Sequence, residues 1–241
     1  MRTTILSVFA SLLCLGTLAQ NEKQNSMKLI YVYDPLCGWC YGFSPVIEEF
    51  AKNHSDEMEI EVISGGMITG DRIGPIGEVA GYISQAYKDV ERSTGVEFGE
   101  GFLEGTMKEG TTIFTSIPPS KALAVFKAKY PEKALDYAAG LQKAIYYDGV
   151  APSNIQHFAK LAEAHGYNSK DFLAEVNLPN ATAIAQFDFE RSSKMGISGF
   201  PTVVVEVNNK LYAIARGYSN LDQLEKQFEQ LKQMVENSKA Q

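Results

Sequence analysis

The chain has 241 residues, 45% of them hydrophobic, and a formal net charge of −7 with a sequence pI near 5.1. This length and composition allow a sizeable buried core, arranged as one domain or as one domain that carries an insertion. No basic patch is evident, so the charge argues against nucleic acid or an anionic membrane as a partner.

Residues 1–19 are typical of a signal peptide. One early basic residue, Arg2, precedes an apolar stretch that is too short and too interrupted to span a bilayer comfortably. Thr17 and Ala19 form a small-x-small site, which predicts cleavage after Ala19. We therefore expect a periplasmic or otherwise extracytoplasmic protein without stable membrane insertion after cleavage. The alternative is a cytoplasmic protein whose translation starts at Met27.

A strand, a helix and a second strand are expected next. Residues 28–34 are β-branched and aromatic and stop at Pro35, which is typical of a strand. Apolar side chains at helical spacing predict a helix over 42–54 that begins near the cysteines. The alternating residues 58–66 end in glycines and predict a second strand. This β-α-β order implies parallel strands.

More than a hundred residues of largely helical pattern follow. Four amphipathic segments separated by Gly, Pro and Asn predict helices, at 76–95, 119–149, 153–167 and 169–176. Ser153 and Ser169 resemble N-caps. Strand patterns return at 202–209 and 210–217, where an Asn-Asn pair favours a tight hairpin. A helix over 220–238 closes the chain.

Cys37 and Cys40 stand three positions apart where the first strand meets its helix. Such a pair serves as half of a metal site, as a structural disulfide or as a redox couple. No second pair exists and the three histidines are scattered, so no metal site is expected. Cys14 would leave with the leader, and no small residue directly precedes it, so lipidation is not expected. A structural disulfide over so short a loop would constrain little of the unfolded chain, which leaves a redox pair.

Three segments resemble the DsbA-like family of the thioredoxin fold, and within it the branch of FrnE-type disulfide oxidoreductases. The segment YDPLCGWCYG, residues 33–42, is similar to that branch's signature D-x-x-C-x-W-C-Y-x-G. Residues 141–168 resemble part of its helical insertion, and GISGFPTVVV, residues 196–205, resembles its G-V-x-G-V-P-T segment. The resemblance covers nearly the whole chain after the leader.

The resemblance implies an α/β, thioredoxin-like fold with a large helical insertion. The thioredoxin-like halves would cover 28–68 and 196–236, and the insertion 69–195. The implied activity is thiol–disulfide oxidoreduction of the protein disulfide oxidase or isomerase type, without a cofactor. Its partners would be cysteine-containing proteins or peptides and a redox protein that recycles it. Two alternatives stay open: a peptide-binding, chaperone-like module, and a glutathione-dependent isomerase of the same fold, which would carry a serine in place of Cys37.

The two cysteines are expected to play different roles. Cys37 lies at the start of the helix, where unpaired N–H groups and a partial positive charge favour an anionic sulfur. Cys40, one turn further, should be more buried. Cys37 would then attack or be attacked, and Cys40 would resolve the mixed disulfide, as in the family. Trp39 either covers the disulfide and offers an apolar face to a partner or is a half-buried packing residue. A reduction potential between about −270 and −120 mV is expected.

Pro201 is the third expected catalytic residue. The resemblance to the thioredoxin fold implies a cis bond between Phe200 and Pro201, with the proline against the cysteine sulfurs. Gly199, Phe200 and Trp39 are expected to contact the substrate, with the Phe200 backbone pairing to an extended peptide. The alternative is an ordinary proline that begins a strand.

At one position the residue differs from that of many relatives with a thioredoxin core. These relatives carry a buried acid six residues before the first cysteine, and here that position is Tyr31. Asp34 matches the aspartate of the signature and is a candidate proton relay, or it simply caps the turn at Pro35. Three tyrosines could line a groove, although aromatic residues at such positions more often belong to the core: Tyr41, Tyr146 and Tyr147.

Overall fold

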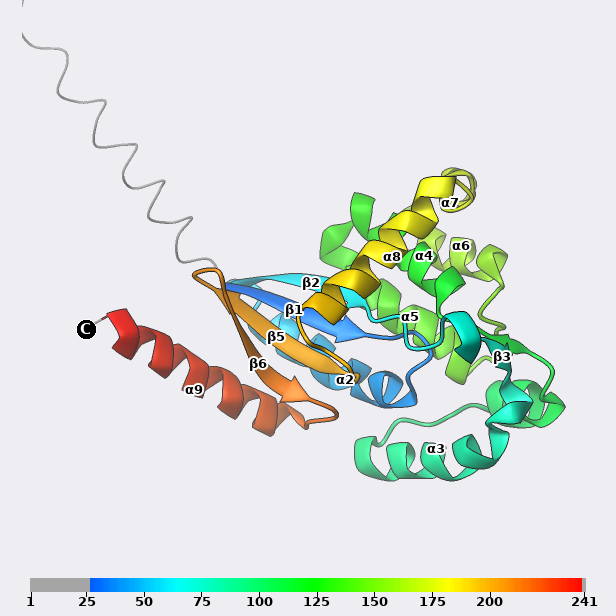
Figure 1. The fold of residues 1–241 in the computed structure, drawn as a ribbon, viewed down its shortest axis with the longest axis horizontal. Helices are drawn as coiled ribbons and strands as arrows, with labels where there is room; N and C mark the ends of the chain where they lie inside the picture. The colour runs from blue at the N-terminus through cyan, green and yellow to red at the C-terminus, as the bar shows by residue number, and fades with distance from the viewer. Residues whose placement is uncertain (1–26, 240–241) are drawn as a thin grey trace, which may run out of the picture.

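The computed structural model describes residues 27–239. The expected leader over 1–19, including Cys14, lies outside these residues. Four strands form the main sheet in the order β2-β1-β5-β6 (Figure 1). Their bounds are β1 (Met27–Tyr33), β2 (Met58–Ser64), β5 (Thr202–Val207) and β6 (Lys210–Arg216). The pairing of β1 with β2 is parallel, and β5 pairs antiparallel with both β1 and β6.

The central position of β1 agrees with its nearly continuous apolar sequence, since both of its faces are covered. Leu29, Tyr31 and Tyr33 belong to the large core that also contains side chains of α2, α5 and α9. Ile30 and Val32 belong to a smaller cluster, which the chain segment before β5 covers. The Asn-Asn turn between β5 and β6 has φ values of 52° and 59°, as the hairpin prediction requires.

Eight α-helices are described within residues 27–239. They are α2 (Gly38–Asn53), α3 (Ala80–Thr94), α4 (Ile117–Lys129), α5 (Ala134–Tyr146), α6 (Ile155–Ala164), α7 (Ser169–Val176), α8 (Pro179–Lys194) and α9 (Leu221–Lys239). Figure 1 shows α4 to α8 grouped at one end of the sheet, while α9 lies along β6 and α3 lies apart from the group, near the start of α2. Between β2 and β5 the chain is therefore largely helical, and the fold is a thioredoxin-like α/β fold with a helical insertion.

Short elements connect these helices. They are η1 (Gly70–Arg72), β3 (Gly74–Pro75), η2 (Ile76–Glu78), the π-helical segment η3 (Gly101–Met107), β4 (Ile113–Phe114) and η4 (Pro131–Lys133). Strands β3 and β4 pair as a separate two-stranded sheet. In residues 27–239 no helix combines the length and the apolar character needed to cross a bilayer.

The insertion differs in detail from the sequence prediction. The segment 119–149 is not one helix, because Pro131 has no N–H to continue α4 and begins the short turn before α5. The N-caps are one residue from the predicted serines: Asn154 accepts from the His157 N–H, and Asn168 accepts from the N–H groups of Lys170 and Asp171. Helix α8 was not predicted, because its buried face consists of small and polar residues, Ala181, Ala185, Asp188 and Ser192.

Candidate active site

The first turn of α2 places the two cysteines. After β1 ends, the Cys37 N–H donates to the Asp34 carbonyl, at 3.0 Å between N and O, and closes a tight turn. Cys37 is the N-cap of α2, and its sulfur accepts from the Cys40 N–H at 3.3 Å. The helix therefore begins four residues before the predicted start at 42, and the Cys37 sulfur stands where free N–H groups stabilise negative charge.

The surroundings of the two sulfurs differ. Both cysteines are free thiols in this structure; Cys37 is 6% exposed and Cys40 is 0% exposed. Burial raises the pKa of the Cys40 thiol well above its ordinary value, and the neighbouring Cys37 raises this pKa further. The neutral thiol of Cys40 is thus favoured, while Cys37 is the sulfur that a partner can reach.

The loop before β5 lies against Cys37. The Phe200–Pro201 peptide bond is cis, as predicted. The Cys37 thiol donates to the Phe200 carbonyl at 3.5 Å between sulfur and oxygen. The Phe200 ring packs against Gly65 in the interior. The ring is so close to this glycine that a Cβ atom added there would lie 2.0 Å from it. The backbone of Phe200, rather than its side chain, contacts the Cys37 sulfur, and Gly199 beside it is exposed.

Asp34 holds three segments together through its carboxylate. One oxygen accepts from the Leu36 N–H at 2.9 Å and from the Ser116 hydroxyl at 2.8 Å, and the other accepts from the Met67 N–H at 2.7 Å. Burial raises the pKa of Asp34, whereas the hydrogen bonds from Met67, Leu36 and Ser116 oppose this rise. Its contact with Leu36 is the turn cap that the sequence suggested. A proton-relay role for Asp34 remains a prediction.

Gln142 of α5 is a residue that the sequence analysis missed. Its amide nitrogen donates to the Asp34 carbonyl at 3.1 Å and to the Cys37 carbonyl at 3.3 Å. Its amide oxygen accepts from the Ser44 hydroxyl at 3.0 Å. The available signal was a polar residue within the apolar stripe of α5, beside Leu141 and Ile145. Gln142 thus ties the cysteine-bearing turn to the insertion.

Tyr31 occupies the position beneath the cysteines where many relatives carry an acid. Its hydroxyl is fully buried and has no hydrogen-bond partner among residues 27–239. Burial raises the pKa of Tyr31 well above its ordinary value, and the sulfurs of Cys40 and Cys37 raise it further. The phenol is therefore neutral at physiological pH, and it lies close to the buried Cys40 sulfur.

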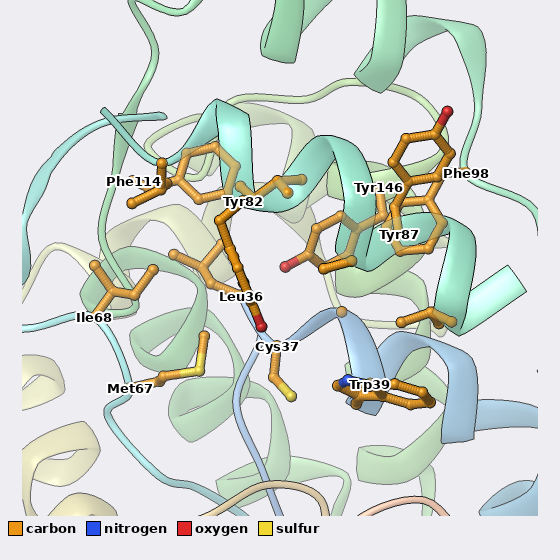
Figure 2. A pocket seen from close by; sticks show the side chains of 15 residues that line it. Leu36, Cys37, Trp39, Met67, Ile68, Tyr82, Tyr87, Phe98, Phe114 and Tyr146 are labelled. Atoms are coloured by element: carbon orange, nitrogen blue, oxygen red, sulfur yellow. The ribbon is translucent and has the colours of Figure 1, made fainter. Parts of the chain in front are cut away.

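An apolar pocket of about 280 Å³ opens beside Cys37. The first turn of α2 forms one wall, with Cys37 and Trp39. Figure 2 shows Tyr82, Tyr87 and Phe98 across the pocket from these two residues. Further lining residues come from the turn before α2, the loop after β2, α3, β4 and α5: Leu36, Gly38, Met67, Ile68, Val79, Ile83, Ala86, Val90, Phe114 and Tyr146. Helix α3 of the insertion thus completes a cavity that Cys37 also lines.

The predicted aromatic residues take different places around this pocket. Trp39 lines it and also packs on Tyr218, with ring centroids 6.1 Å apart. Tyr146 lines the pocket, and Tyr41 lies behind it in the core, stacked on Tyr146 at 5.5 Å. Tyr147 is 44% exposed and lies outside the lining. Within the described residues, no group of three His, Cys, Asp or Glu side chains could hold a metal ion.

A sheet of this topology, with C-x-x-C at the start of its first helix and a facing cis-proline loop, defines the class of thioredoxin-fold proteins. Within that class, the chain belongs to the family of the DSBA-like thioredoxin domain, whose family model matches residues 28–229.

Solved structures of similar proteins cover most of the chain. A putative protein disulfide isomerase from Nitrosomonas europaea is 28% identical, with a TM-score of 0.78 over 87% of this chain and 98% of that chain. The cytosolic disulfide reductase DsbM from Pseudomonas aeruginosa is 25% identical, with a TM-score of 0.71 over 86% of this chain and 99% of that chain.

A curated relative is more distant. The ClpXP adapter protein SpxH from Halalkalibacterium halodurans is 21% identical over 192 residues. The match covers 77% of this chain and 61% of the relative, so this chain spans less than two thirds of the length of that protein.

Proposed function

We propose that the protein is a thiol–disulfide oxidoreductase of the FrnE-type branch, which exchanges disulfides with cysteine-containing proteins or peptides. The difference between the two sulfurs carries this proposal. Cys37 caps a helix, contacts the Phe200 carbonyl and lines an open pocket, whereas Cys40 is completely buried one turn further. This difference supports a division of roles in which Cys37 forms the mixed disulfide and Cys40 resolves it.

These positions support the following exchange. In the oxidised protein, a substrate thiolate attacks the Cys37 sulfur, and the Cys37–Cys40 bond breaks as the substrate–Cys37 bond forms. Cys40 leaves as a thiolate and takes up a proton, which its buried surroundings favour. A second substrate thiolate then attacks the substrate sulfur of the mixed disulfide and releases Cys37. The reverse sequence reduces a substrate disulfide.

A peptide-binding, chaperone-like module is the second candidate, because the apolar pocket could hold a peptide without turnover. A glutathione-dependent isomerase is less consistent with the chain, which carries a cysteine where such isomerases carry a serine. The expected leader supports an extracytoplasmic location, and initiation at Met27 would give a cytoplasmic form. A redox protein that recycles the enzyme is part of the same proposal. The acidic chain supports no nucleic-acid role.

Reduction of insulin by catalytic amounts of protein, with dithiothreitol in excess, tests this function. We expect the wild type to accelerate precipitation of the insulin B chain and Cys37→Ser to fall to the uncatalysed rate. Cys14→Ser is a matched control that removes the third cysteine and should behave as the wild type. Equal rates for the wild type and Cys37→Ser would contradict the proposal. Stoichiometric binding of unfolded polypeptide without turnover would support the chaperone-like module instead.

A further inference from the structure

We propose that the buried hydroxyl of Tyr31 donates a hydrogen bond to the Cys40 sulfur while that sulfur carries negative charge during the exchange. This inference rests on the proposed function and adds a residue that acts on its buried sulfur. Tyr31 would speed both steps in which Cys40 is a thiolate: its release by a substrate thiol and its attack on the mixed disulfide.

The hydroxyl of Tyr31 has left water without gaining a partner. Tyr31 is 1% exposed, and its hydroxyl has no hydrogen-bond partner within residues 27–239. Burying a hydroxyl without a partner costs free energy, and a phenylalanine ring would fill nearly the same space without this cost. The hydroxyl is therefore best explained by an acceptor that exists in another state of the protein.

The buried cysteine lies above this tyrosine. Tyr31 of β1 belongs to the same core cluster as Cys40 and Phe43, which stand three positions apart on one face of α2. The ring centroids of Tyr31 and Phe43 are 5.9 Å apart. Burial is the largest cause of the raised pKa of Tyr31, followed by the charges of Cys40 and Cys37, and an interaction of the hydroxyl with the Cys40 side chain also contributes.

The reduced state explains why this interaction is not a well-formed hydrogen bond here. Both cysteines are free thiols in this structure. The sulfur of a neutral thiol is a weak acceptor and has little attraction for the phenol. An anionic sulfur is a much stronger acceptor, so the same hydroxyl gains a partner when Cys40 becomes a thiolate.

The Cys40 thiolate needs such a donor more than Cys37 does. The Cys40 N–H donates to the Cys37 sulfur at 3.3 Å, so the start of α2 stabilises negative charge on Cys37. Burial raises the pKa of the Cys40 thiol, and the neighbouring Cys37 and the charge of Asp34 raise it further. A hydrogen bond from the Asp34 backbone opposes this rise, and the Tyr31 hydroxyl would be a further donor.

A phenol at this position acts differently from the acid that many relatives carry. The pKa of Tyr31 lies well above its ordinary value, so the side chain is neutral at physiological pH. It therefore cannot take the proton of the Cys40 thiol, as a carboxylate could. It can only donate, and it stabilises the Cys40 thiolate without becoming charged itself.

The exchange is balanced without proton transfer from the phenol. When a substrate thiolate attacks Cys37, the new disulfide forms, and the electron pair of the broken Cys37–Cys40 bond goes to the Cys40 sulfur. Tyr31 keeps its proton and donates to this sulfur, which then takes up a proton from water. In the resolving step the Cys40 thiol loses a proton to water, its thiolate attacks Cys37, and the substrate leaves as a thiolate. No electrons are gained or lost overall.

The experiment separates the two sulfurs by reacting the reduced protein with one equivalent of dithiobis(nitrobenzoate). In the first phase Cys37 attacks the reagent and releases one coloured thionitrobenzoate. In the second phase Cys40 attacks the adduct on Cys37 and releases the other, at a rate that does not depend on the reagent concentration. All proteins carry Cys14→Ser, so that the third cysteine does not react.

Tyr31→Phe should slow the second phase and leave the first unchanged. A hydrogen bond to a charged group is worth about tenfold in the population of the thiolate. A more basic thiolate is also a better nucleophile, which returns part of this factor. We therefore expect the second phase to be about threefold slower, with the first phase within about 1.5-fold of the wild type. The urea midpoint of the variant should equal or exceed that of the wild type, because an unpartnered hydroxyl is removed.

Two further proteins distinguish a donor from a packing role. Tyr167→Phe removes another buried hydroxyl that lacks a partner within residues 27–239, but in the insertion, and should keep both wild-type rates. A fluorinated tyrosine introduced at Tyr31 keeps the hydroxyl and makes it a stronger donor. It should restore the second phase at least to the wild-type rate.

The negative results point to different conclusions. A second phase of Tyr31→Phe as fast as that of the wild type, or equal slowing of both phases, would overturn the role of Tyr31 alone. A wild type that releases only one thionitrobenzoate per chain would show that no Cys37–Cys40 disulfide forms. That result would overturn the proposed function and this inference together.

Discussion

The thioredoxin-like core and the helical insertion contribute different things to the candidate site. The core supplies the two cysteines in the first turn of α2 and, in the facing loop, the Phe200 carbonyl that contacts Cys37. The insertion supplies support and shape, through Gln142 behind the cysteine turn and α3 along the pocket.

This division has a chemical meaning. We expect the core to carry out the exchange itself. The insertion forms the α3 wall of the pocket and holds the cysteine turn through Gln142. Changes in the core should therefore affect turnover, and changes in the insertion should affect stability.

The largest effect is expected within the core. Cys40→Ala should trap mixed disulfides through Cys37, at least about tenfold more than Cys37→Ala traps through Cys40, because only Cys37 is open to the pocket. Both variants are compared in a Cys14→Ser background, so that adducts of the third cysteine are not counted. Non-reducing gels of cell extracts measure the yield. Equal yields would show that the two sulfurs are equally accessible and that the assignment of Cys37 as nucleophile is wrong.

Anchoring of the insertion on the sheet should give the next largest effect. Lys127 of α4 donates to the Val62 carbonyl of β2 at 2.8 Å and to the buried carboxylate of Asp188 in α8 at 2.6 Å. Lys127→Met removes the ammonium partner of that carboxylate and leaves it only the Ser64 N–H at 3.4 Å, which should cost about 3 kcal/mol of the free energy of unfolding. Lys160→Met, at an exposed position of α6, is the control. Urea unfolding measures both, and a loss below about 1 kcal/mol for Lys127→Met would contradict the anchoring role.

The support of the cysteine turn is tested by Gln142→Ala. The change removes the donor from the buried carbonyls of Asp34 and Cys37, which should cost about 2 kcal/mol in urea unfolding. Gln156→Ala replaces an exposed glutamine of α6 and should stay within about 0.5 kcal/mol of the wild type. Equal stability of the two variants would mean that the insertion does not hold the turn.

The smallest effect is a pH dependence at the contact between α2 and α5. Burial raises the pKa of Glu48 from 4.5 to about 7, and Asp136 of α5 contributes to the rise. The folded protein binds the Glu48 proton more tightly than the unfolded chain does. Protonation of Glu48 therefore stabilises the folded state fully below pH 4.5, and this stabilisation is lost as the pH rises through about 7.

Glu48→Gln removes this titration. The difference in the free energy of unfolding between the variant and the wild type should be about 1 kcal/mol more in favour of the variant at pH 8 than at pH 4. This expected value is small because the carboxylate is partly exposed. Urea unfolding at the two pH values measures the difference, and Glu49→Gln, at an exposed neighbour, is the control. A stability difference that does not change with pH would contradict the raised pKa.

The parts of the fold that depend on local sequence signals were predictable. The strand that ends before Pro35, the cysteine pair at a helix start and the Asn-Asn hairpin each depend on a few adjacent residues. The cis bond at Pro201 was predicted from the resemblance to the thioredoxin fold. The sheet order also follows from the β-α-β unit and the hairpin, once the resemblance places them in one sheet.

The parts that depend on distant partners were not predictable. Helix α8 buries Ala181 and Ala185 against a close neighbour, so it lacks the large apolar residues that indicate a helix. Gln142 and Ser116 meet Asp34 only in the folded chain, from 108 and 82 positions away. The pocket wall of α3 carries no motif, because any apolar surface of the right shape would serve.

A redox titration of the cysteine pair tests the central claim most directly. The protein is equilibrated in a series of glutathione buffers of different redox potential, quenched in acid and alkylated. Mass spectrometry then measures the number of labels per chain. Cys37 and Cys40 should change together by two labels per chain, as one two-electron couple with a potential between about −270 and −120 mV. Oxidation of one cysteine without the other, or two cysteines that stay unlabelled because zinc holds them, would contradict the account.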